Sequence, residues 1–116
     1  MKTAWILQGG WDGHEPHLTS RRFERMLRRH AYQTRIMDSL DCLADEDAVM
    51  ALDLMVFCWT MGDIKPEYTQ AVSRAVGNGA GLAGCHGGLC DAFRGDTQWQ
   101  FITGGQWVSH PGGDGV

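Results

Sequence analysis

Short apolar runs along the chain alternate with longer stretches in which apolar residues recur every three or four positions. The run "TAWILQGGW" (3–11) ends in a pair of glycines and predicts a buried strand followed by a sharp turn. Residues 54–59 are apolar at every position, which is typical of a central strand covered on both faces. The segments "YQTRIMDS" (32–39) and "GAGLAGCHGG" (79–88) predict two further strands.

Two segments between these strands have the periodicity of helices. In "PHLTSRRFERMLRRH" (16–30) a proline suits the first turn, and Phe23, Met26, Leu27 and His30 share one face. We therefore expect this helix to cover the sheet, with His30 packed rather than functional. The segment "KPEYTQAVSRAVGNG" (65–79) predicts another helix that ends in glycine, and helical turns are expected in "DCLADEDAVMAL" and in "LCDAFRGDTQWQFITGG".

Strands that alternate with helices predict a doubly wound α/β domain, with one parallel sheet flanked by helices and joined by right-handed crossovers. The length of 116 residues favours a single domain over 1–116. In such sheets ligands bind beyond the carboxyl ends of the strands, where the strand order reverses. The residues that follow each strand are therefore the first candidates for function.

Composition narrows the possible partners. A formal charge of −4 argues against a general affinity for nucleic acid, and the five arginines between Arg21 and Arg29 are interpreted as a solvated helix face. No apolar run is long enough for a membrane span, and the start of the chain does not resemble a signal peptide. We expect a cytoplasmic protein with four reduced cysteines, because their spacing is not that of a zinc ribbon.

The segments after the strands carry most of the histidines and several acidic and aromatic residues. They are "QGGWDGHEPH", "TMGD", "GCHGG" and, at the end of the chain, "GGQWVSHPGG". All four should lie on one rim of the sheet. The rim residues singled out for function are Trp11, Asp12, His14, His17, His86, Trp107 and His110.

These side chains permit two kinds of chemistry. Neutral imidazoles are common zinc ligands, so His14, His17, His86 and His110 are a candidate set for a divalent metal, although the H-x-x-H spacing is also compatible with capping and packing around a turn. Asp12, just before the first predicted helix, is suited to capping that helix and to a catalytic role.

The glycine run "AGCHGG" (83–88) has the character of a sharp turn between strand and helix, with small residues around one projecting side chain and free backbone N–H donors. The frame "G-C-H-G-G" places His86 at the apex, and the frame "A-G-C-H-G" places Cys85 there. Both frames are open at this point. In either frame Gly87 and Gly88 are expected beside a bound substrate.

Four segments together resemble one known family. "GGWDGHEPH", "FCWTMGDI", "GLAGCHGGLCDAFR" and "FITGGQWVSHPGG", in this order, are similar to the ThuA-like (trehalose utilisation) family over essentially the whole chain. The resemblance implies a flavodoxin-like fold of the class I glutamine amidotransferase type and a role in the use of trehalose or a related disaccharide. It also implies a histidine where amidotransferases carry their nucleophilic cysteine. That position is His86, with Asp12, His14 and His110 at other matching positions.

The leading hypothesis is a protein of carbohydrate metabolism that binds a sugar at the rim. Trp11, Trp59 and Trp107 would offer rings for stacking, and His86 would transfer a proton or hold a metal. One alternative is a cysteine-dependent hydrolase or stress protein of the PfpI type, with Cys85 as nucleophile. Another is a non-catalytic sugar-binding or assembly module.

Members of the family continue past "HPGG" into another strand, a further H-P element and an acidic motif. The chain is therefore expected to be the N-terminal part of a longer family domain. An uncovered sheet edge would favour a homo-oligomer.

Overall fold

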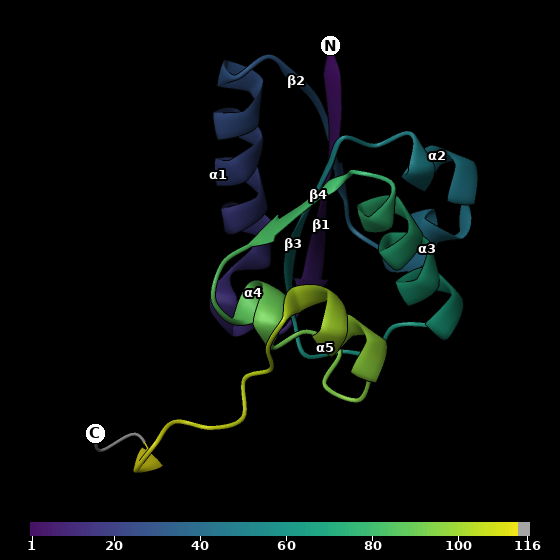
Figure 1. The fold of residues 1–116 in the computed structure, drawn as a ribbon. Coiled ribbons are helices and arrows are strands. Elements are labelled where there is room, and N and C mark those ends of the chain that lie inside the picture. Colours follow the sequence, from purple (N-terminus) through teal and green to yellow (C-terminus); the bar gives the residue numbers. More distant parts are fainter. Residues whose placement is uncertain (114–116) are drawn as a thin grey trace.

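A computed structural model describes residues 1–113 and shows a four-stranded parallel sheet with helices on both faces (Figure 1). The strand order is β2-β1-β3-β4, which is the flavodoxin-like doubly wound order and confirms the predicted fold class. The elements in chain order are β1 (Lys2–Gly10), η1 (Asp12–His14), α1 (Pro16–Arg29), β2 (Tyr32–Met37), η2 (Leu40–Ala44), α2 (Glu46–Met50), β3 (Leu54–Thr60), α3 (Pro66–Gly77), β4 (Gly81–Gly84), α4 (Gly87–Cys90) and α5 (Thr97–Thr103). The last three residues of the predicted domain lie outside the described residues.

The larger part of the core lies on the face of the sheet that α2, α3 and α5 cover. Met55 and Phe57 of β3 are fully buried there, and Trp99 of α5 and Val72 of α3 pack in the same cluster. The ring of Trp99 contacts that of Phe57 at 4.7 Å between centroids. Alternate residues of a strand point to opposite faces, so the uniformly apolar β3 supplies both sides of the core, as its sequence predicts.

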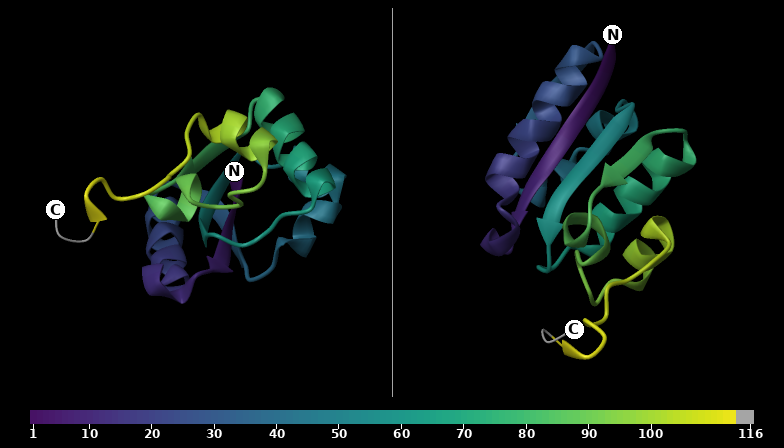
Figure 2. Two further views of the ribbon diagram at one scale, coloured as in Figure 1. Left: turned by 90° about the horizontal axis from the view of Figure 1, so that it is seen from below. Right: turned by 90° about the vertical axis from the view of Figure 1, so that its left-hand side faces the viewer.

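Helix α1 covers the other face, where the core is smaller. Ile6, Val56 and Cys58 form a buried cluster, against which Phe23 and Leu27 of α1 pack. Figure 2 shows the same layers from two further directions, with β4 at the opposite edge of the sheet from β2.

The predicted contact face of α1 is partly wrong. His30 is exposed at the carboxyl end of the helix, and Met26 is 51% exposed. The buried face includes Pro16 and Ser20, and it continues through the partly buried Phe23 and Leu27. The small polar Ser20 lies at the centre of this face, donates a hydrogen bond to the carbonyl of His17 and leaves no exposed surface. The predicted face was based on apolar residues alone, and it therefore did not include the buried polar Ser20.

The arginines of α1 are exposed, as predicted. Arg28 pairs with Glu24 one turn away at 2.9 Å. Within residues 1–113, no helix has the length and apolar character needed to cross a membrane.

Candidate functional site

The candidate site lies where the strand order reverses, between the carboxyl ends of β1 and β3 and beside that of β4. The loop after β1 leads through η1 into α1, while β4 turns directly into α4 (Figure 1). These segments bring together His14, Thr60 and His86, which line one cavity of about 180 Å³. The position agrees with the general rule for ligand sites in open α/β sheets.

His86 occupies the apex of the turn between β4 and α4, which we call the elbow. Its backbone has φ 53° and ψ −137°, and the carbonyl of His86 accepts hydrogen bonds from the first helical amides at Leu89 and Cys90. A non-glycine residue with positive φ is strained, and such strain is concentrated at functional sites. Of the two sequence frames, the structure shows the one with His86 at the apex, and Cys85 lies one residue before it.

Of the two glycines after the apex, Gly87 allows a close approach to a neighbouring side chain and Gly88 does not require one. A Cβ atom on the buried Gly87 would lie 2.6 Å from Cε1 of His14 and 3.2 Å from its Nδ1. The imidazole of His14 therefore rests directly on the backbone of α4. A Cβ atom on Gly88 would lie 3.5 Å from Cα of Cys58, which is an ordinary contact.

The ring of His14 is held on several sides. Its Nδ1 is hydrogen bonded to the hydroxyl of the buried Thr60 at 2.8 Å. Its ring meets that of His86 edge to face at 5.2 Å between centroids, and that of Trp11 in the same way at 4.8 Å. The Thr60 hydroxyl therefore fixes one nitrogen of His14, and Nε2 has no hydrogen-bond partner within residues 1–113.

A second cavity of about 170 Å³ lies on the other side of these histidines. Its lining combines imidazole, indole and guanidinium groups, from Trp11, His14, Met61, His86, Gly87, Asp91, Arg94, Trp107 and His110. The indole of Trp107 meets the ring of His110 edge to face at 5.3 Å. The guanidinium of Arg94 lies 5.1 Å from the centre of the Trp107 ring, within the range of a cation–π contact.

Arg94 is oriented by a nearly buried carboxylate. Its Nε and Nη2 donate to the two oxygens of Asp91 at 2.5 and 2.9 Å, and the side chain of Asp91 is only 8% exposed. These bonds raise the pKa of the Arg94 guanidinium above its usual value, so the group is charged at all ordinary pH values. The remaining N–H groups of Arg94 are left to donate to another acceptor.

Two predicted residues lie away from both cavities. Asp12 is exposed at the start of η1, and no hydrogen bond of its side chain is found in the described part of the chain, so it does not cap α1. His17 is an exposed residue of α1. Neither residue lines the cavities around His86.

The predicted metal ligands are only partly brought together, because His17 lies apart from the other three. His14, His86 and His110 share a cavity, but residues 1–113 contain no group of three or more histidine, cysteine or acidic side chains arranged to hold a metal ion. The partly buried Trp59 does not line either of the cavities around His86. Its ring packs on Gly9, where a Cβ atom would lie 2.6 Å away, and it belongs with the core.

The sequence reasoning missed Thr60, Asp91 and Arg94. The rule that ligands bind at the carboxyl ends of the strands could have found Thr60, because it is the last residue of β3. Asp91 and Arg94 follow the elbow at a spacing of three residues, which favours ion pairs, in the quoted segment "LCDAFR". That spacing was the available signal for the pair.

A protein-family model described as trehalose utilisation (ThuA) matches residues 3–115. The chain belongs to the ThuA family. The match includes every residue of the site described above and supports a role related to trehalose utilisation. Searches of curated proteins and of solved structures give no match.

Proposed function

We propose that this ThuA-family protein binds trehalose, a related disaccharide or a derivative of one in the cavity between His86 and Trp107. The observation that carries the proposal is the strained His86, which shares this cavity with two exposed or half-buried indoles. Indole faces stack on the apolar face of a sugar ring, and the surrounding polar groups donate to hydroxyl oxygens.

The polar groups around the cavity are well suited to a polyhydroxylated ligand. Arg94 is held by Asp91 and stacked on Trp107, so its free N–H groups are pre-oriented. Nε2 of His14 and the ring nitrogens of His86 and His110 can each donate or accept. Preorganised groups of this kind lose little conformational entropy when a ligand binds.

We further propose that His86 transfers a proton to or from the bound sugar. An imidazole is an efficient general acid or base near neutral pH. The backbone conformation at residue 86 sets the direction in which its side chain leaves the turn, and the ring of His14 contacts its ring edge to face. The supporting geometry does not require a metal ion.

Binding and turnover are tested separately. Calorimetric titration with trehalose is expected to give a saturable signal in the wild type and a much weaker one in His86→Ala, while His17→Ala binds as the wild type does. Absence of binding in a folded wild type would refute the proposed ligand class.

Turnover is measured on trehalose and its oxidised derivatives by product analysis. Loss of turnover in His86→Gln with retained binding would support proton transfer. Binding without turnover in the wild type would instead favour the non-catalytic sugar-binding module. Turnover that is lost in Cys85→Ser and kept in His86→Gln would favour the cysteine-dependent alternative.

A further inference from the structure

Two cysteines lie side by side on neighbouring strands next to the candidate site. Strands β3 and β4 pair in parallel up to Phe57 and Gly84; Cys58 is the next residue of β3, and Cys85 is the first residue after β4. Adjacent strands lie about 4.8 Å apart, which is within the Cα separation of roughly 4.4–6.8 Å that disulfides span.

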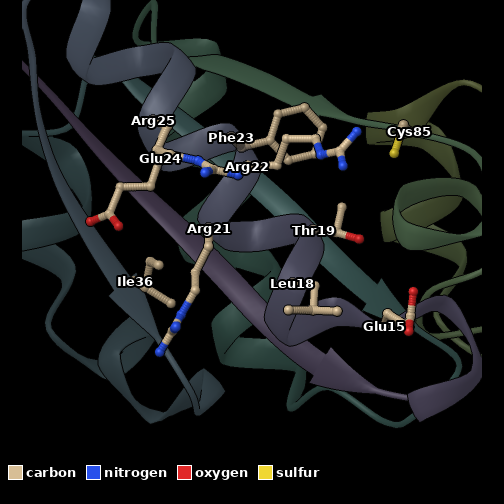
Figure 3. A pocket seen from close by; sticks show the side chains of 10 residues that line it. All are labelled: Glu15, Leu18, Thr19, Arg21, Arg22, Phe23, Glu24, Arg25, Ile36 and Cys85. Carbon is tan, nitrogen blue, oxygen red and sulfur yellow. The ribbon is translucent and has the colours of Figure 1, made fainter.

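Both side chains project from the same face of the sheet. Cys58 belongs to the cluster under α1, whereas Leu82 packs in the core on the opposite face. Cys85, which follows β4, lines a groove together with Thr19 and Phe23 of α1, so it lies on the α1 side of the sheet. Figure 3 shows the Cys85 sulfur across from α1, on the far side of a broad groove from Thr19 and Phe23.

The two thiols share a space but differ in exposure. Both line the cavity of about 180 Å³ that also contains His14 and His86. Cys85 is exposed, while Cys58 is 5% exposed. Burial, together with the negative charge that Cys85 carries when ionised, raises the pKa of the Cys58 thiol to about 12.

We propose that Cys85 and Cys58 form an oxidisable pair that a hydroperoxide converts into a disulfide. The thiolate of Cys85 attacks the hydroperoxide, so that an S–O bond forms, the O–O bond breaks and the leaving oxygen departs as water or an alcohol after taking a proton. Cys58 then attacks the sulfenic sulfur of Cys85. The S–S bond forms as the S–O bond breaks, and the hydroxyl leaves as water with the proton of Cys58.

The order of the two steps follows from the surroundings of each thiol. Cys85 reacts first because it is exposed, whereas Cys58 is buried and protonated at neutral pH. His14 and His86 line the same cavity and can relay the proton of Cys58 to the departing hydroxyl. The disulfide would link Cys85, the residue before His86, to Cys58 of β3. Oxidation would therefore restrain the backbone of the turn that carries His86.

The test uses hydrogen peroxide and a protein with only these two cysteines. In Cys42→Ser/Cys90→Ser, trypsin leaves Cys58 in peptide 36–74, because Lys65 precedes a proline, and Cys85 in peptide 75–94. After peroxide treatment and alkylation of the remaining thiols, an unreduced digest is expected to contain both peptides joined, lighter than their sum by two hydrogens. Reduction should separate them.

A matched variant tests the order of events. In Cys42→Ser/Cys58→Ser/Cys90→Ser, Cys85 is expected to remain a sulfenic acid that dimedone labels, while Cys42→Ser/Cys90→Ser shows little dimedone adduct because the disulfide forms.

Three outcomes would overturn the proposal: over-oxidised Cys85 without the joined peptide, a joined peptide found only in covalent dimers, or no peroxide reaction at either thiol. Circular dichroism establishes that the variants are folded. If the double variant does not fold, fragment sequencing of the wild-type digest assigns the bond, and a Cys85 bond to Cys90 or Cys42 would likewise overturn the proposal.

Discussion

Gly87→Ala and Gly88→Ala place the same methyl group on adjacent residues of α4, and we expect only Gly87→Ala to destabilise the fold. The Cβ atom at Gly87 would lie 2.6 Å from Cε1 of His14, about 0.8 Å inside the 3.4 Å at which ordinary contact begins. The Cβ atom at Gly88 would meet Cα of Cys58 at 3.5 Å and would fit without displacement.

The magnitudes follow from packing and from helix propensity. Alanine is more favourable than glycine inside a helix by about 0.5–1 kcal/mol, which acts equally on both variants. Overpacking costs about 1–3 kcal/mol, and losing the His14 hydrogen bond to Thr60 costs about 1 kcal/mol more. Gly87→Ala should therefore lower the free energy of unfolding by about 1–3 kcal/mol, and Gly88→Ala should leave it unchanged or raise it slightly.

Urea unfolding of the two variants and the wild type measures this difference, provided that the slopes with denaturant are equal. Trehalose binding should be weakened only in Gly87→Ala, because only there is His14 displaced. Equal stability of the two variants would refute the claim that the His14 ring rests on the α4 backbone.

Three further outcomes are expected. Thr60→Val should lower the free energy of unfolding by about 1 kcal/mol and weaken trehalose binding, because His14 loses its hydrogen bond, while Thr60→Ser should restore both in the same titrations. Arg94→Ala should lower the free energy of unfolding measured in urea, because the carboxylate of Asp91 is left buried without its partner. Arg94→Lys should recover only part of this loss. An Arg94→Ala variant as stable as the wild type would contradict this reasoning. The stability contributed by Cys58 is present below pH 9, the thiol pKa in the unfolded chain, and is lost as pH rises toward its folded pKa of about 12. Between these values the wild type should therefore lose stability more steeply than Cys58→Ala, and equal slopes would argue against a protonated buried thiol.

The sequence predicted the parts of the fold that depend on local pattern. The uniform apolar run of β3 and the periodic face of α3 both form the expected elements. Because strands alternate with helices, a parallel sheet was expected, and in such a sheet the segments that follow the strands lie together at one edge. The strand order could not be worked out from pattern alone, because it depends on which strands pair.

The candidate site was less predictable for three physical reasons. Both elbow frames satisfied the glycine spacing, and only the backbone angles at His86 distinguish them. His14 and His17 have helical spacing, but η1 ends and α1 begins between them, with Glu15 in a left-handed conformation. The partnership of Asp91 with Arg94 depends on burial of the carboxylate, which the sequence does not show.

The most direct test of the central claim is a trehalose titration followed by NMR of the five histidine side chains, each assigned with its own substitution. Three of them line the proposed sugar cavity, and two lie on exposed parts of α1 or at its end and serve as internal controls. We expect the ring signals of His14, His86 and His110 to shift together along one binding curve, while those of His17 and His30 remain in place. Signals at the cavity that do not move at saturating sugar, or shifts confined to His17 and His30, would contradict a sugar site at the strained elbow.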